Sequence, residues 1–292
     1  MQSEHHLFEQ ARPRLLGLAY RILGSFQDAE DVVQDTFLKW SSIDPGTIRN
    51  HQSWLTTVCT RRCLDFRKAA EQTRLSYTGA WLPEPIKLTE DNGESNLEMA
   101  SSLTTAFLLM LERLTPKERA AFLLHQVFEV PYPQIASILD MKEPTCRKLV
   151  SRAKNFVSQD RIRHDTPEDL QKKFLTAFEQ ALDDGSTEPL AAMLSEDIRL
   201  SADGGGKVPT IRKDVEGKTR VARFISQKAS RYWAGYKRRI IKLNGGLGVV
   251  IEDSKGPGVI VTFAFDESGR AAQIQIMRNP EKINSLKPIA MV

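Results

Sequence analysis

Three stretches of charged side chains give this 292-residue sequence its most evident chemistry. Asp28, Asp31 and Asp35 follow one another at spacings of three and four, which places three carboxylates on one face of a helix. Six basic residues against two acidic ones lie between Arg49 and Arg74, and seven against two lie between residues 142 and 164. The basic segments indicate a polyanionic partner, and the acidic face indicates a second, basic partner.

The second basic segment combines charge with a helical pattern. A helix over residues 144–157 would hold its apolar side chains within about 120° of arc, and the basic ones on the remainder. A short helix over residues 132–139 and a tight turn at 140–142 precede it, in the layout of a helix-turn-helix. The pattern predicts a helix that packs on its own domain and enters a DNA major groove. A merely solvated charged face is the alternative.

The first basic segment lies on a helix expected over residues 52–70. Its bases alternate with Trp54 and Phe66, a composition compatible with binding single-stranded nucleic acid by charge and stacking. For Trp54 itself we favour a place in the core. Cys59 and Cys63 share a helix face, but without a second ligand pair they indicate small buried residues rather than a zinc site.

The acidic cluster could also be considered as a metal site. No histidine or carbonyl-rich loop accompanies it, so the sequence favours an exposed face that docks a basic partner over calcium or zinc binding. All five histidines and all three cysteines precede residue 165, which leaves acid–base chemistry in the last part to Asp, Glu, Tyr or Lys. The loop Asp203–Lys207 lacks the spacing of a phosphate-binding loop, and we expect a glycine-permitted turn that packs against another domain.

These side chains must be positioned by several domains. Residues 1–75 are helical in pattern, residues 76–96 form a linker rich in proline, glycine and acids, and residues 97–164 are helical again. In the second helical part, Thr115, Pro116 and Glu118 predict a capped helix start. Residues 165–292 show two helices, a short strand, a third helix and four β-rich runs separated by turn signals. This order predicts an α+β domain with an antiparallel sheet.

The overall composition excludes several protein classes. Hydrophobic residues make up 41% and charged residues 27%, and the net charge is +4, which is ordinary for a globular protein. No apolar run reaches the roughly 18–20 residues that a bilayer helix needs, so we expect no membrane association. The first residues show no signal-peptide pattern, and three cysteines make no disulfide framework. We therefore expect a cytoplasmic protein.

Two segments resemble a known family. Residues 7–74, with Tyr20–Gly24 and Asp28–Phe37, resemble region 2 of bacterial sigma factors of the small extracytoplasmic-function class. Residues 114–157, with Cys146–Leu149, resemble region 4 of the same proteins. The remaining part resembles a SnoaL-like (NTF2-like) domain. The implied fold is two all-α sigma domains, the second with a helix-turn-helix, followed by an α+β NTF2-like cone.

The resemblance implies roles by position, in a transcription initiation factor with no catalytic residue, metal or cofactor. The clamp helices of the largest RNA polymerase subunit would be docked by Asp28, Asp31, Gln34 and Asp35. The opened −10 element would be held by Arg49, Asn50, Arg61, Arg62, Arg67 and Lys68. The −35 element would be contacted by Arg147, Lys148, Ser151, Arg152 and Lys154, in a region that also meets the polymerase flap.

The sequence departs from the family pattern in the helix-turn-helix. Asp140 replaces a common glycine, and Pro144 stands where small residues are usual. Asp tolerates the left-handed conformation that the turn needs, and Pro suits a first helical turn, so we expect the motif to form.

The C-terminal extension resembles that of a sigma subgroup in which it is thought to replace a separate anti-sigma factor. A short tether gives a millimolar-range effective concentration, so even a weak contact would hold the sigma domains in one arrangement. We expect an intramolecular contact that modulates activity in cis. Its expected residues are Trp81, Pro83, Asp203, Gly204, Gly205, Gly206, Lys207, Asn279 and Pro280.

Two other functions remain open at this point. A ligand-sensing helix-turn-helix regulator would bind duplex DNA without polymerase and would need no acidic docking face. A DNA-binding module fused to an isomerase- or cyclase-type enzyme would need a carboxylate deep in an open apolar cone, and the histidine-free last part argues mildly against it.

Overall fold

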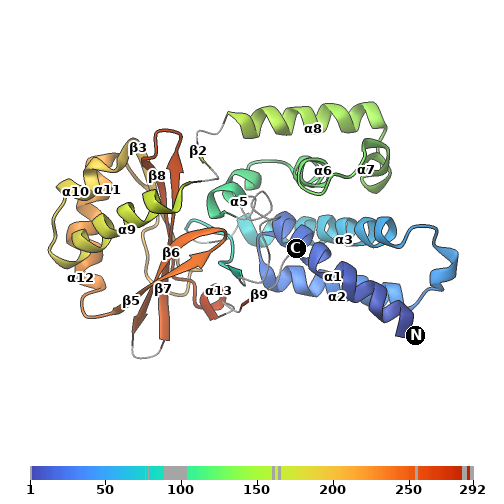
Figure 1. Cartoon of the computed structure of the whole chain (residues 1–292), viewed down its shortest axis with the longest axis horizontal. Coiled ribbons are helices and arrows are strands. Elements are labelled where there is room, and N and C mark those ends of the chain that lie inside the picture. The colour runs from blue at the N-terminus through green and yellow to red at the C-terminus, as the bar shows by residue number, and fades with distance from the viewer. Residues whose placement is uncertain are drawn as a thin grey trace.

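The computed structural model describes residues 2–75, 77, 79–88, 104–159, 162–163, 166–253, 256–284 and 288–289. Figure 1 shows three parts: an N-terminal helical part (residues 2–75), a helix-turn-helix part (residues 104–159) and a C-terminal part (residues 166–284) in which helices cover a sheet. Much of the expected linker, including the acidic stretch after residue 90, and the expected start of the second helical part at residue 97 lie outside the described residues.

The N-terminal helical part consists of α1 (Gln2–Leu23), α2 (Phe26–Ser41), the short 3-10 helix η1 (Pro45–Thr47) and α3 (His51–Leu75). Helix α2 begins where Ser25 accepts a hydrogen bond from the backbone N–H of Asp28, as expected for a serine N-cap. Its apolar face is buried, with Ala29, Val32 and Val33 at most 2% exposed. The acidic residues therefore occupy the face turned away from the core.

The helix-turn-helix part contains α5 (Thr105–Glu112), α6 (Pro116–Gln126), α7 (Tyr132–Ile138) and α8 (Glu143–Ser158). The capping box predicted at Thr115 and Glu118 is present at the start of α6. Asp140 takes a φ of 49° in the turn, and Pro144 lies in the first turn of α8. Both departures from the family pattern are therefore accommodated by local backbone conformation.

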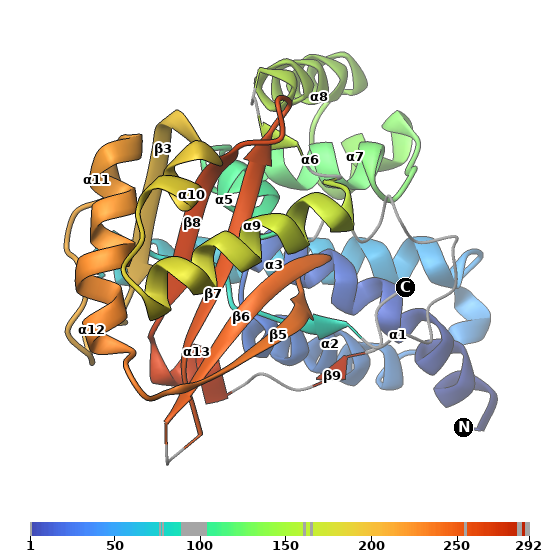
Figure 2. The same cartoon turned by 60° about the vertical axis from the view of Figure 1, so that its left-hand side comes forward.

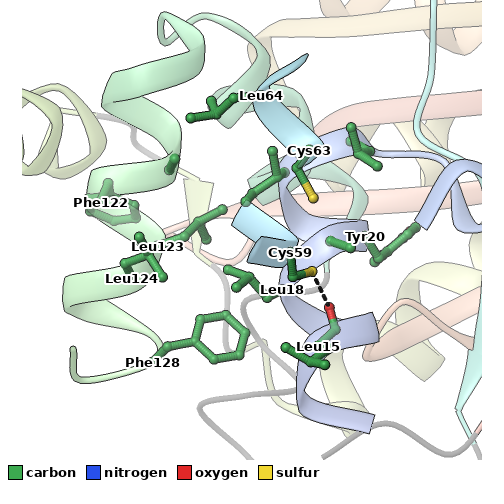
Figure 3. Close-up of a cluster of buried hydrophobic side chains, with 14 of the residues drawn as sticks. Leu15, Leu18, Tyr20, Cys59, Cys63, Leu64, Phe122, Leu123, Leu124 and Phe128 are labelled. Atoms are coloured by element: carbon green, nitrogen blue, oxygen red, sulfur yellow. Dashed lines mark hydrogen bonds between the residues drawn. The ribbon is translucent and has the colours of Figure 1, made fainter. Parts of the chain in front are cut away.

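The two helical parts share one hydrophobic core. Figure 3 shows Leu15 and Leu18 of α1, Cys59 of α3 and Phe122 of α6 in a single buried cluster. Cys59 and Cys63 are 0% exposed, which confirms the prediction of small buried residues, and Cys59 Sγ lies 3.8 Å from the carbonyl oxygen of Leu15. The helix-turn-helix part is thus packed against the N-terminal helices instead of standing apart from them.

The C-terminal part begins with two helices and a long strand and continues with a second helical run and a meander of strands. Its helices are α9 (Glu168–Asp183), α10 (Glu188–Ala192), α11 (Lys218–Arg223), the π-helical turn η3 (Phe224–Ala229), α12 (Ser230–Tyr232) and α13 (Pro280–Asn284). Its strands are β3 (Leu194–Asp203), β4 (Val215–Glu216), β5 (Lys237–Leu243), β6 (Gly246–Asp253), β7 (Gly256–Asp266) and β8 (Ala271–Met277). The four predicted β-rich runs correspond to β5–β8.

The sheet has the order β4-β3-β8-β7-β6-β5. Strands β5 to β8 form the antiparallel meander that the sequence predicted, and β4 is antiparallel to β3. The pair β3–β8 is parallel, so the sheet is mixed. Strands joined by a tight hairpin must be antiparallel. Since a long connection of helices and strands separates β3 from β8, these two strands can pair in parallel. Two-residue strands extend the pairing: β2 (Ile162–Arg163) pairs with β7, and β1 (Lys87–Leu88) pairs with β9 (Pro288–Ile289).

Both faces of the sheet are covered. Val249, Ile251 and Val261 point to the face packed against α9, α11 and η3, and Figure 2 shows α9 crossing the sheet on that side. The alternate residues Val250 and Ile260 pack on the opposite face, where the segment 79–88 contributes Leu82. The sheet therefore lies between its own helices and the helical parts (Figure 1). Among the residues described, no helix is long and apolar enough to cross a membrane.

Candidate nucleic-acid interface and its interdomain contacts

A groove of about 950 Å³ runs along the N-terminal helical part between α2, η1 and α3. Four of the six residues expected at the −10 element line it: Arg49, Asn50, Arg61 and Arg62. Trp54 lines it too, half-buried against the core with its ring 5.7 Å from that of Trp40. The groove thus combines cations with an aromatic wall, as a surface for an unpaired strand requires.

Two of the cations in the groove already have partners. Arg61 donates from Nε to the carbonyl oxygen of Ile138 at 2.9 Å and from Nη2 to that of Ser137 at 2.8 Å. Both carbonyls lie at the C-terminal end of α7, where helix carbonyls lack partners within the helix. Arg62 binds Asp35 at 2.7 Å. The helix-turn-helix part therefore closes one side of the groove in this arrangement.

Arg67 and Lys68 do not line the groove. Arg67 is 11% exposed in its side chain, pairs with Glu112 at 3.2 Å and donates to the carbonyl oxygen of Ile22. Glu112 also binds Arg119, which is 0% exposed and donates to the backbone of α1. Arg67 thus joins α3 to the helix-turn-helix part, and its expected contact with DNA stays a prediction. Lys68 is exposed beside Asp65.

The acidic face of α2 is open to solvent at its centre. Asp31 and Gln34 are exposed, Asp28 is half-buried, and Asp35 is the partner of Arg62. No group of three potential metal ligands occurs within the described part of the chain. Asp31 is therefore the exposed carboxylate of this set, with the exposed amide of Gln34 one turn further along the helix.

Helix α8 presents its basic face outward, and Figure 1 shows it at the outer edge of the molecule with α6 and α7 between it and α3. Lys148, Ser151 and Lys154 are exposed. Arg147 binds Glu143 and lies 4.4 Å from the ring centre of Tyr132, and Arg152 binds Glu118 at 3.0 Å. The opposite face buries Cys146, whose thiol pKa is raised by that burial, together with Val150 and Ala153.

A buried carboxylate joins the segment 79–88 to the C-terminal part. Asp203 is 0% exposed and accepts hydrogen bonds from Tyr77 Oη at 2.5 Å, the backbone N–H of Leu82 at 3.0 Å and that of Gly205 at 2.9 Å. Lys282 Nζ lies 2.8 Å from Asp203 and 4.3 Å from the ring of Trp81. These groups form what we call the Asp203 hub. Burial and the Asp203 carboxylate raise the pKa of Tyr77 well above its ordinary value.

The rest of the expected interdomain set surrounds this hub. Asn279 donates from Nδ2 to Tyr77 Oη at 3.0 Å, and its side chain packs on Gly205. Pro280 begins α13, which carries Lys282. Lys207 is exposed and pairs with Glu281, the residue before Lys282 on α13.

A second buried network joins the same segment to α1 and α2. Glu84, 3% exposed, accepts hydrogen bonds from Ser25 Oγ and from the backbone N–H groups of Phe26 and Gln27, at 3.2, 2.7 and 3.4 Å. Its carbonyl oxygen accepts from Tyr20 Oη, which in turn accepts from Asn244 of the C-terminal part at 2.7 Å. Burial raises the pKa of Tyr20.

Sequence reasoning assigned no interdomain contact to Glu84, Tyr20, Tyr77, Asn244 or Lys282. Glu84 follows Pro83, and Lys282 lies two residues after Pro280, so the residues expected at this contact are sequence neighbours that could have indicated both. Tyr20 was within the motif Tyr20–Gly24, but neither it nor Tyr77 or Asn244 carries a local pattern for this contact, because each acts through a partner distant in the chain.

Comparisons with known proteins agree with this geometry. The family model for Sigma-70 region 2 matches residues 7–73, and that for Sigma-70 region 4 matches residues 104–157. The ECF RNA polymerase sigma factor SigJ of Mycobacterium tuberculosis is 32% identical over 286 residues, covering 94% of this chain and 91% of the relative. This chain belongs to the ECF RNA polymerase sigma factors.

Two further comparisons extend over most of the sigma factor. A probable ECF sigma factor SigI of Mycobacterium tuberculosis is 30% identical over 71% of this chain and 72% of its own length. The crystal structure of SigJ superposes with a TM-score of 0.74 at 28% identity, covering 97% of this chain and 99% of that one. The agreement includes the C-terminal part, so the three-part architecture is shared.

Membership defines the activity of this sigma factor. It is a non-enzymatic transcription initiation factor that acts with RNA polymerase core and promoter DNA. The DNA-binding regulator and the enzyme fusion considered from the sequence are therefore set aside.

Proposed function

We propose that this sigma factor docks on the polymerase through the α2 acidic face and reads promoter DNA through the groove and α8. Asp31 and Gln34 are exposed on α2, opposite its buried stripe, and would meet the clamp helices of the largest subunit. Arg49, Asn50 and Trp54 line the groove where the opened −10 strand would lie. Lys148, Ser151 and Lys154 project from α8 toward a −35 major groove, and the same domain would meet the flap. With these partners, we expect it to work in the cytoplasm.

Charge reversal tests the docking face. Asp31→Lys should abolish run-off transcription and co-purification with core polymerase, because it places a cation opposite a basic partner, while thermal unfolding should change little at an exposed site. Glu267→Lys, an equally exposed reversal in a β-turn of the C-terminal part, is the matched control. Normal initiation by Asp31→Lys would mean that another surface docks the polymerase.

We further propose that the C-terminal part restrains the two sigma domains in cis, in place of a separate anti-sigma factor. The observation that supports this proposal is the Asp203 hub. Its buried carboxylate binds both residues 79–88, which we call the connecting segment, and α13. The segment in turn holds the start of α2 through Glu84, while Arg61 is held by α7. A promoter strand entering the groove would compete with α7 for Arg61, so the closed arrangement opposes DNA binding.

The restraint is tested in the full-length chain. Asp203→Asn removes the charge of the hub but keeps its shape, and we expect basal run-off transcription with core polymerase to rise several-fold as the closed arrangement weakens. Glu267→Gln also removes one carboxylate charge, at an exposed turn of the C-terminal part outside the hub, and should leave transcription unchanged. Unchanged or lower transcription with Asp203→Asn, in protein that remains folded by circular dichroism, would refute restraint through this contact.

A further inference from the structure

A cavity of about 260 Å³ opens in the C-terminal part, on the face of the sheet covered by helices and away from the groove. Phe224, Ala229 and Trp233 form one wall, and Ala202 and Ile276 at the ends of β3 and β8 form another. Tyr232, 75% exposed, lies at the rim. An apolar cavity of about 150 Å³ is enough to bind benzene, so this one accepts a single ring with a short substituent.

The charged groups of the cavity have one sign. Arg278 and Lys228 line it, and no lining residue carries a carboxylate. Neither cation forms an ion pair with a residue that the structure describes. The half-buried arginines Arg14, Arg67 and Arg238 each have a carboxylate or a backbone carbonyl as partner.

Arg278 in particular is only partly satisfied. It donates from Nη1 to the carbonyl oxygen of Pro209, which fixes the guanidinium at the cavity wall. Its Nε is buried and has no hydrogen-bond partner among the described residues. A buried unpaired donor is costly, and guanidinium groups bind carboxylates through two parallel N–H groups. A carboxylate bound beside this wall would supply the partner that Nε lacks.

From this combination we infer that the C-terminal part binds a small apolar monocarboxylate, such as an aromatic acid with one ring, in this cavity. The ring lies between Trp233 and the strand ends, and the carboxylate pairs with Arg278 while Lys228 adds charge at the rim. The apolar walls favour binding of the hydrocarbon part of the ligand. The two cations, Arg278 and Lys228, favour the carboxylate over the corresponding neutral amide.

The cavity is placed to influence the restraint, an extension that rests on the proposed function. The backbone N–H of Arg278 donates to the carbonyl oxygen of Asp203 at 2.7 Å, and Asn279 follows directly in the hub. Ala202, a wall residue, precedes Asp203 on β3. A bound acid would fix both strand ends in the arrangement that the hub needs, and a ligand that favours one arrangement shifts the population toward it.

Calorimetric titration of the full-length protein tests binding without reference to transcription. The probes are trans-cinnamate and its neutral near-isostere cinnamamide. We expect cinnamate to bind with a dissociation constant on the order of 0.1 mM, about tenfold more tightly than the amide, because the charged hydrogen bonds are the stronger ones. Arg278→Met should remove this preference, and Arg231→Met, an exposed arginine on α12 outside the cavity, should keep it.

The outcomes separate the two claims. Equal binding of acid and amide to the wild-type protein, no saturable binding of cinnamate at about 5 mM, or a preference that survives Arg278→Met each overturns the inferred site. The wild-type comparison holds even if Arg278→Met fails to fold. If cinnamate binds as expected but leaves run-off transcription unchanged at saturation, the site stands and its coupling to the restraint is refuted. Lowered transcription supports both.

Discussion

Replacing Glu84 measures how strongly the connecting segment holds the start of α2. The carboxylate is 3% exposed and accepts from Ser25 Oγ and from two backbone N–H groups in the first turn of the helix. Glu84→Gln keeps an acceptor but loses the charge that the helix N-terminus favours, and we expect a loss of about 1–2 kcal/mol in the free energy of unfolding. Glu84→Ala leaves the buried N–H of Phe26 without its partner, with an expected loss of about 2–4 kcal/mol.

Urea unfolding, followed by circular dichroism, measures the loss in unfolding free energy for Glu84→Gln and for Glu84→Ala. Glu9→Gln, an exposed glutamate on α1, is the control and should stay within about 0.5 kcal/mol of the wild type. The order wild type, Glu84→Gln, Glu84→Ala is the result that the contacts require. A loss below about 0.5 kcal/mol for Glu84→Ala would refute the reasoning, because it would mean that water satisfies the start of α2 as well as the carboxylate does.

Three further predictions concern the interdomain contacts. Stability should fall as the pH rises above about 10, because the folded state keeps the protons of Tyr77 and Tyr20 at raised pKa values while the unfolded tyrosines lose them; Tyr77→Phe should reduce this slope in urea titrations at pH 9–11 and leave the part that Tyr20 contributes. Gly205→Ala should lower the thermal midpoint well beyond Gly235→Ala, since both have positive φ but only at Gly205 would a Cβ lie 2.5 Å from a buried side chain. Arg67→Met should cost about 1–3 kcal/mol in chemical unfolding, because it removes hydrogen bonds to the carbonyl oxygen of Ile22 and to the largely buried Glu112, which keeps Arg119 as a partner; Arg62→Met, at an exposed ion pair, should cost under about 1 kcal/mol.

The elements that depend on neighbouring residues could be predicted from the sequence. The cap at Thr115 and Glu118, the left-handed turn at Asp140 and the apolar stripe of α8 all formed as expected, because each involves residues within one or two helical turns. The same holds for the meander β5–β8, whose turns have local signals.

The parts that depend on distant pairs could not be predicted. The common core of α1, α3 and α6, and the contact of Arg61 with carbonyls 76 and 77 residues away, leave no periodic trace in the sequence. The cationic composition of the groove was predicted, but Arg67 showed that a basic residue on the right helix can instead pair with a buried glutamate. The spacing of residues predicts which face of a helix a side chain occupies. It does not predict which part of the protein or which partner that face contacts.

Arg61 is bound to α7 in the structure and would bind promoter DNA in our proposal, and this exchange sets the scale of the proposed restraint. Two hydrogen bonds from a guanidinium to carbonyl oxygens are worth about 1.5–3 kcal/mol each, and a promoter phosphate or base would replace them with contacts of similar strength. Exchange at this residue alone is therefore close to neutral and cannot keep the groove closed. The difference must come from contacts that DNA does not replace, which are the buried Arg67–Glu112 pair, the shared helical core and the Asp203 hub. The hub and the network of Asn244, Tyr20 and Glu84 both join the C-terminal part to residues 79–88, so under the proposed restraint a signal received by the C-terminal part would reach the DNA-binding helices through these two contacts.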